Sequence, residues 1–207
     1  MTQSLSRFYH WFLAVPLGYQ LLQNLLGARR ARRIWVKEHV KPQKGDRILD
    51  IGCGTAAILE FLPAVDYYGF DMSAFYIEFA RKKYGDRGHF EQKSVNQASV
   101  KDLPPCDFVF TTGVIHHLSD DEAEELIQLA FDVLKPGGRF VTSDPARCEN
   151  RPFIENFQIN RDRGQFIRKP EEYCLLAKKV FDSVTLTVYH NLLYIPYSHA
   201  VLEAKKP

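Results

Sequence analysis

An apolar run that ends in glycines, and an acidic residue after a second apolar run, are the features best suited to ligand binding. The residues from Ile48 through Asp50 to Gly54 predict a strand followed by a tight turn, whose glycines let the backbone approach a ligand closely. Asp71 ends the next predicted strand, nineteen residues beyond Gly52. A carboxylate at that place can accept hydrogen bonds from both ribose hydroxyls. Together these features predict adenosine bound across the carboxyl ends of two neighbouring strands.

Asp50 separates the adenosine cofactors that such a turn could accept. Gly52, Gly54 and Ala57 also satisfy the dinucleotide pattern G-x-G-x-x-G/A, which is weak alone. A dinucleotide places a pyrophosphate on this turn, and a carboxylate would repel that charge. S-adenosylmethionine has no phosphate and brings a cationic α-ammonium and a sulfonium, which a carboxylate attracts. The turn therefore favours S-adenosylmethionine. A nicotinamide-dependent oxidoreductase and a non-catalytic adenosine-binding module remain as alternatives.

Four short segments of this sequence, in the same order as in the family, resemble motifs of the class I S-adenosylmethionine-dependent methyltransferases. They are residues 49–55, 69–73, 114–118 and 134–138. The resemblance covers residues 45–205 and implies an α/β fold, a doubly wound and mostly parallel seven-stranded sheet with a reversed last strand. It implies methyl transfer to a small-molecule acceptor by direct displacement, with S-adenosylhomocysteine as the product. The cofactor contacts expected from it are Asp50, Gly52, Cys53, Gly54, Asp71, Met72, Ser94, Val95, Thr112 and Gly113.

The chain departs from this family at two places in the expected cofactor site. Ala56 stands where the family has the third glycine of its first motif, and we expect a slight shift of the turn there. The family often holds the adenine amino group with an acid after the third strand. Residues 93–96 contain no acid, so Ser94 or Asn96 would have to make that contact.

Candidate groups for the acceptor follow the fourth and fifth predicted strands. His116, His117 and Asp144 could each act as a general base there, although a base is needed only if the acceptor must lose a proton. A purely structural histidine is the competing interpretation. We expect the acceptor pocket to form between the aromatic-rich N-terminus and an insertion at residues 145–169, whose arginines suit an anionic acceptor. The candidate substrate contacts are Tyr9, Tyr19, Arg163 and Arg168.

Strands and helices alternate along the part of the chain that must position these residues. Strands are predicted at 47–51, 66–70, 89–93, 108–111 and 139–143, and helices after the first turn through residue 62, at 73–84 and at 122–134. This alternation predicts a parallel sheet with helices on both faces. A helix at 170–180 is followed by strands at 183–190 and 198–205, which should pair antiparallel at one edge. We divide the chain into a helical cover, residues 1–45, and a cofactor-binding domain, residues 46–207.

Charge and composition narrow the classes of partner. Residues 1–45 carry eight Lys or Arg and a single acid, whereas the whole chain of 207 residues has a net charge of +2. The basic segment keeps RNA as an alternative acceptor. However, the motifs typical of base-modifying methyltransferases are missing after the fourth predicted strand, which disfavours a nucleic-acid acceptor. The amphipathic segment 8–33 leaves peripheral membrane contact, and a lipid or quinone acceptor, open. The spacing of the four cysteines and the lack of a signal peptide predict a cytoplasmic protein without a metal; the oligomeric state stays open.

Overall fold

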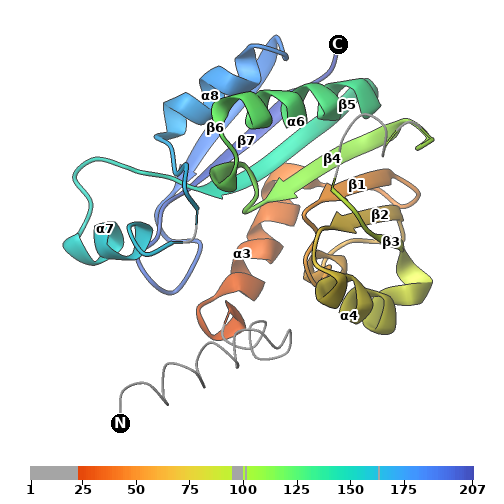
Figure 1. Ribbon diagram of the computed structural model, residues 1–207, viewed down its shortest axis with the longest axis horizontal. Coiled ribbons are helices and arrows are strands. Elements are labelled where there is room, and N and C mark those ends of the chain that lie inside the picture. The colour runs from red at the N-terminus through yellow and green to blue at the C-terminus, as the bar shows by residue number, and fades with distance from the viewer. Residues whose placement is uncertain (1–22, 95–99, 101, 163) are drawn as a thin grey trace.

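The strands form one seven-stranded sheet in the order β3-β2-β1-β4-β5-β7-β6 (Figure 1). This computed structural model describes residues 23–94, 100, 102–162 and 164–207, so Tyr9, Tyr19, Val95 and Arg163 lie outside the described part. The strands are β1 (Arg47–Ile51), β2 (Asp66–Asp71), β3 (His89–Gln92), β4 (Cys106–Thr112), β5 (Leu134–Pro145), β6 (Ser183–Tyr189) and β7 (His199–Lys205). β7 runs antiparallel to both β5 and β6, and the other pairs are parallel. The predicted sheet, its reversed last strand and its antiparallel edge pair are confirmed.

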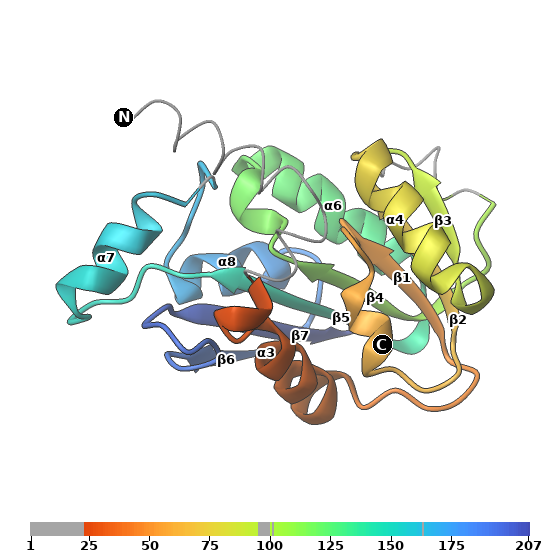
Figure 2. The same cartoon turned by 90° about the horizontal axis from the view of Figure 1, so that it is seen from below.

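Helices cover both faces of the sheet, which explains why its strands are nearly continuous apolar runs. Successive residues of a strand point to opposite faces, so Leu49 and Ile48 belong to two separate cores. Leu49 packs with α6 (Asp120–Val133) and α8 (Pro170–Lys178). Ile48 packs with α3 (Ala28–Trp35), η1 (Val36–Val40) and α4 (Ala74–Tyr84). Figure 2 shows α3 and α4 beside the sheet. Asp50, two residues further along β1, lies on the face of Ile48.

Local capping sets where two of these helices begin. Ser73 Oγ accepts a hydrogen bond from Tyr76 N at 3.4 Å, and α4 follows as predicted with Ile77 and Ala80 buried. At α6, Ser119 and Glu122 form a reciprocal capping box, so the helix begins at Asp120, two residues earlier than expected.

Two elements differ from the prediction. The turn after β1 leads only to η2, a 3-10 helix at Ala57–Glu60, because Ala56 has a left-handed backbone and Pro63 disfavours helix in the residue before it. The strand expected to begin at residue 139 begins at Leu134, which pairs with Cys106 ahead of a register shift.

The covers around the sheet are only partly described. α3 and η1 confirm helix over residues 28–40 of the expected cover, and Gly27, with a φ of 99°, precedes α3. The insertion after β5 contains α7 (Phe153–Ile159), which lies beyond the carboxyl end of β5 (Figure 1). Of the helices that the structure describes, none has the length and apolar character needed to cross a bilayer. The division into two domains at residue 45 stays a prediction.

Candidate functional site

The turn between β1 and η2 is bent by three residues with a left-handed backbone. Gly52, Gly54 and Ala56 have φ angles of 75°, 54° and 52°. A Cβ on Gly52 would lie 2.4 Å from Cγ2 of Val114, so a side chain does not fit there. Ala56 keeps the backbone conformation that glycine favours, at a cost of about 1 kcal/mol. The alanine is therefore accommodated by local strain.

Asp71 ties the end of β2 to this turn. Its Oδ2 accepts a hydrogen bond from Gly54 N at 2.9 Å, and its Oδ1 accepts one from Ser73 N at 2.8 Å. Each carboxylate oxygen has a second lone pair. The half-buried Asp71 can therefore still accept hydrogen bonds from hydroxyls of a ligand at the turn.

Asp50 is a buried carboxylate with one bonded oxygen and one without a partner. Tyr67 OH donates to Oδ2 at 2.5 Å, and Oδ1 has no hydrogen-bond partner. Burial raises the pKa of Asp50 to about 7, against the opposing effect of the Tyr67 hydrogen bond. An unmatched buried carboxylate oxygen is unfavourable unless a donor or cation meets it. The unpartnered oxygen of Asp50 therefore fits the α-ammonium of S-adenosylmethionine, whereas its charge would repel a pyrophosphate.

The other predicted cofactor residues lie along the same edge of the sheet. Thr112 and Gly113 are exposed at the end of β4, and Ser94 is exposed after β3. Met72 is 74% exposed directly after β2. Cys53 is half-buried in the turn, where burial raises the pKa of its thiol. The structure thus brings these residues to one edge, and their contacts with a cofactor stay predictions.

A second polar cluster lies at the carboxyl end of β5 and centres on His116. Its Nδ1 lies 2.8 Å from Asp144 Oδ1, and its Nε2 lies 3.4 Å from Asp162 Oδ1. Burial disfavours the charged imidazole, but the two carboxylates prevail and raise the pKa of His116 to about 9. At neutral pH His116 is therefore a cation held between two carboxylates. His117 is exposed, with its ring centroid 4.1 Å from that of His116.

Asp162 and Tyr197 belong to this cluster, although the sequence analysis did not select them. Tyr197 OH donates to Asp162 Oδ2 at 2.5 Å, and Gly164 N donates to Asp162 Oδ1 at 2.7 Å. Although burial opposes it, these bonds and His116 hold the pKa of Asp162 below its usual value. A Cβ on Gly164 would lie 2.0 Å from Cδ2 of His116, so the insertion packs directly on the imidazole. An Asp-x-Gly turn pattern was the sole local signal.

Arg168 has a partner within the chain on each nitrogen of its guanidinium. Nε and one terminal nitrogen donate to Asp120 Oδ1 at 2.9 and 2.7 Å. The terminal nitrogens also donate to the carbonyl oxygens of Ile115, Phe166 and Leu118. Buried Arg168 therefore fastens the insertion to the segment after β4, and its position gives no support to the expected contact with an anionic acceptor.

The other described arginines of the insertion also contact groups within the chain. Arg147 donates to Asn160 Oδ1 at 2.9 Å, and Arg151 donates to Glu155 Oε2 at 2.9 Å. Arg161 lies over the ring of Phe157 at 4.8 Å from the centroid. The described arginines of the insertion are therefore engaged by groups of the insertion itself.

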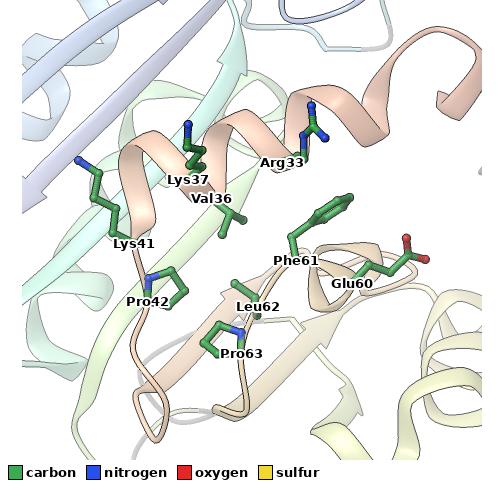
Figure 3. A pocket seen from close by; sticks show the side chains of 9 residues that line it. All are labelled: Arg33, Val36, Lys37, Lys41, Pro42, Glu60, Phe61, Leu62 and Pro63. Atoms are coloured by element: carbon green, nitrogen blue, oxygen red, sulfur yellow. The ribbon is translucent and has the colours of Figure 1, made fainter.

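A shallow groove lies between the helical segment of α3 and η1 and the residues after η2 (Figure 3). Phe61 and Leu62 belong to its apolar lining, and Arg33, Lys37 and Lys41 follow one another at intervals of four residues along the opposite wall. None of the described candidate residues for cofactor or acceptor lines this groove. It is a separate feature of the surface.

Thiols and acids do not combine into a metal centre in the described ranges. Cys53, Cys106, Cys148 and Cys174 are free cysteines. Within residues 23–94, 100, 102–162 and 164–207, no three His, Cys, Asp or Glu side chains are grouped so that they could hold a metal ion.

Known methyltransferases are similar to this chain in sequence. A family model described as a methyltransferase domain matches residues 48–138. O-methyltransferase cnsE from Penicillium expansum is 32% identical over 168 residues, which cover 76% of this chain and 59% of that protein. Phosphoethanolamine N-methyltransferase 1 from Arabidopsis thaliana is 26% identical over 157 residues, which cover 73% of this chain and 31% of that protein. The chain thus spans less than two thirds of the length of either relative.

The solved structure of human N-acetylserotonin methyltransferase, in complex with S-adenosylmethionine, has the same fold. Its TM-score is 0.66 at 18% identity, and the match covers 95% of this chain and 56% of that chain. The likeness at this identity concerns the fold alone. Joined to the matched family model, the glycine turn and the reversed β7, it leads to one assignment. This chain belongs to the class I S-adenosylmethionine-dependent methyltransferases.

Proposed function

We propose that the chain binds S-adenosylmethionine at the edge formed by β1 and β2 and transfers its methyl group to a small-molecule acceptor. The observation that carries this proposal is the buried Asp50 Oδ1, which lacks a partner beside a glycine-rich turn. A cationic amino-acid tail satisfies this oxygen, and a phosphate is repelled by it. Asp71, anchored to the same turn, accepts hydrogen bonds from the ribose.

The chain's own contribution to the reaction is to align two reactants. When bound, S-adenosylmethionine would supply a methyl group on a sulfonium: a lone pair of the acceptor would bond to the methyl carbon as the carbon–sulfur bond breaks and its electron pair goes to sulfur. Holding the reactants in line can contribute about 7–11 kcal/mol. Asp50 and Asp71 hold the donor end, and the groups around His116 serve the acceptor.

His116 and Asp144 are the acceptor-side pair in this proposal. Asp144 orients the imidazole through Nδ1, and Nε2 is directed to Asp162 at 3.4 Å. An acceptor hydroxyl that takes the place of the Asp162 carboxylate lowers the pKa of His116, which releases its Nε2 proton to solvent. The neutral imidazole then accepts the proton that the acceptor loses. His117 is the alternative base, because it is exposed at the same place.

The acceptor is a small molecule, as the names of the O-methyltransferase and phosphoethanolamine N-methyltransferase relatives suggest. The predicted anionic acceptor now depends on Arg163, which lies outside the described residues, since Arg168 is already paired. Two carboxylates, Asp144 and Asp162, flank His116. This charge favours a neutral hydroxyl or an amine at the reacting end of the acceptor.

Peripheral membrane contact is expected through residues 8–33, of which 8–22 lie outside the described part of the chain, and we extend that proposal to the groove that Arg33 lines. Arg33, Lys37 and Lys41 lie about one turn apart on the helical wall of the groove, whose other wall carries apolar Phe61 and Leu62; the ends of Lys37 and Lys41 point away from those two side chains (Figure 3). Cations at the rim of an apolar groove suit an anionic lipid surface. Flotation with anionic and with neutral vesicles, using the chain and its Lys37→Glu variant, tests this contact. The cytoplasmic location stays a prediction.

Calorimetry followed by a methyl-transfer assay tests the main proposal. We expect S-adenosylhomocysteine to bind with micromolar affinity and NADH to give no binding heat. Tritium from methyl-labelled S-adenosylmethionine should then appear in a member of a panel of hydroxylated aromatics and ethanolamine derivatives. An absence of S-adenosylhomocysteine binding at millimolar concentration, or tight binding of NADH, would refute the proposal.

A further inference from the structure

Tyr67 reaches Asp50 from the neighbouring strand. The register of β1 and β2 places Ile48 opposite Tyr67 and Asp50 opposite Gly69. The tyrosine ring therefore has to extend along the sheet by one same-face position to bring its hydroxyl to Asp50 Oδ2 at 2.5 Å. Tyr67 is fully buried, and its pKa is raised well above its usual value by burial, so the hydroxyl acts as a donor.

Two glycines make room for the ring in this extended position. A Cβ on Gly69 would lie 2.8 Å from Tyr67 Cε1, and one on Gly88 would lie 2.8 Å from Tyr67 Cδ1. Phe90 packs against the ring with a centroid distance of 5.8 Å. A tyrosine that only filled the core would not require glycine at both position 69 and position 88. The space that these two glycines leave places the hydroxyl beside one oxygen of Asp50.

We propose that Tyr67 is a positioning residue for the cofactor, whose hydroxyl fixes the Asp50 carboxylate so that Oδ1 stays open to a cationic amino group. The inference rests on the proposed binding of S-adenosylmethionine. Tyr67 lies outside the four sequence segments that resemble family motifs. The direct evidence is that Oδ2 is bonded and Oδ1, equally buried, has no partner.

The same hydrogen bond controls how much of Asp50 is ionised near neutral pH. Burial raises the pKa of Asp50 to about 7, the bond from Tyr67 lowers it, and the charge of Asp71 raises it. The charge of Asp50 acts in turn on the Cys53 thiol, which burial keeps neutral. Phe110, opposite Asp50 on β4, carries no charge. Without the Tyr67 bond, more alkaline solution is needed to ionise Asp50.

The Tyr67→Phe variant tests the inference, with Tyr84→Phe as the matched control. Tyr84 belongs to the same core, but its hydroxyl bonds Glu60 at 3.1 Å. For Tyr67→Phe we expect the Kd of S-adenosylhomocysteine to rise about tenfold at pH 7 and only about twofold at pH 8.5, because alkali restores the carboxylate in both proteins. In the cofactor-free protein, carbon-13 NMR should show Asp50 titrating at a higher pH than in the unaltered chain. Tyr84→Phe should change neither quantity.

Several results would overturn the inference. Equal affinities of Tyr67→Phe and the unaltered chain at both pH values would refute the role of Tyr67 alone, whereas an unaltered chain that fails to bind S-adenosylhomocysteine would refute the proposed function as well. A loss of affinity that is the same at pH 7 and pH 8.5 would indicate a structural role. If Tyr67→Phe does not fold, Cζ-labelled tyrosine in the unaltered chain replaces it. The Tyr67 signal must then follow the Asp50 titration, and S-adenosylhomocysteine must suppress that titration; independence of the two signals contradicts the inference.

Discussion

Two groups of residues at the carboxyl ends of the strands differ in how far apart in the sequence their contacting residues lie. We call them the cofactor edge, around Asp50 and Asp71, and the acceptor edge, around His116. At the cofactor edge, the bonds from Tyr67 to Asp50 and from Gly54 to Asp71 each join residues 17 positions apart. At the acceptor edge, His116 meets Asp144 across 28 positions and Tyr197 meets Asp162 across 35. The two bonds at the cofactor edge need only the parallel strands β1 and β2 and the connection between them, whereas those at the acceptor edge require β5, the insertion and the approach to β7 to be in place together.

The largest effect should come from Asp50→Asn, which breaks the cofactor edge alone. We expect S-adenosylhomocysteine affinity at pH 8 to fall about 30- to 1000-fold, because removing one partner of a buried charged pair costs about 2–4 kcal/mol. The free energy of unfolding should not fall, since a buried charge is removed. Calorimetry and urea denaturation measure the two quantities. Asp66→Asn, at the far end of β2, is the control, and equal losses in both variants would contradict the assignment.

Gly164→Ala should damage the acceptor edge and leave the cofactor edge intact. The added methyl group would lie 2.0 Å from the His116 ring, and such overpacking costs about 1–3 kcal/mol. We expect kcat/KM for the acceptor to fall about tenfold, with S-adenosylhomocysteine affinity within about twofold of the unaltered chain. Gly85→Ala, where a Cβ meets no atom within 4 Å, is the matched control. A parallel loss of cofactor affinity would show that the two edges are not independent.

Asp162→Asn should make the stability of the acceptor edge less dependent on pH. The folded pKa of His116 is raised to about 9 from 6.5, so its contribution is complete below about pH 6.5 and disappears as the pH rises through about 9. We expect the variant to be less stable by about 1–2 kcal/mol at pH 6.5 and nearly equal at pH 10. Urea denaturation at both values measures this. A stability difference that does not change with pH would contradict the ion pair.

The smallest effect should come from Ala56→Gly, which relieves strain at the cofactor turn. Glycine adopts the left-handed backbone freely, so we expect a gain of about 0.5–1 kcal/mol after the entropy of the unfolded chain is counted. Ala57→Gly, in the 3-10 helix, should lower stability instead. Thermal denaturation of both variants provides the measurement, and a destabilised Ala56→Gly would show that the methyl group is needed for packing.

Most of the fold follows from local sequence pattern. The predicted bounds of the first strand are those of β1, and Ser73 begins the predicted helix α4. Apolar runs and caps are local signals, so they can be recognised without the rest of the structure. The short η2 was not predicted, because the strain at Ala56 and the closeness of Pro63 act together to limit it.

The candidate site could be predicted only where its contacts are local. Asp50 and Asp71 belong to recognisable sequence motifs, whereas Tyr67 resembles any core residue of a buried strand. Arg168 suggested anion binding because its sequence neighbours do not reveal the carbonyl oxygens that it meets in the fold. Asp162 reaches His116 through the path of a long insertion, which no periodic pattern describes.

A crystal structure of the complex with S-adenosylhomocysteine would show which group meets the open oxygen of Asp50. We expect the α-ammonium within hydrogen-bond distance of Asp50 Oδ1, the ribose hydroxyls on Asp71, and the Tyr67 hydroxyl still on Oδ2. An α-ammonium bound elsewhere, with Asp50 Oδ1 left unpaired or turned toward a protein group, would contradict the proposed role of Asp50.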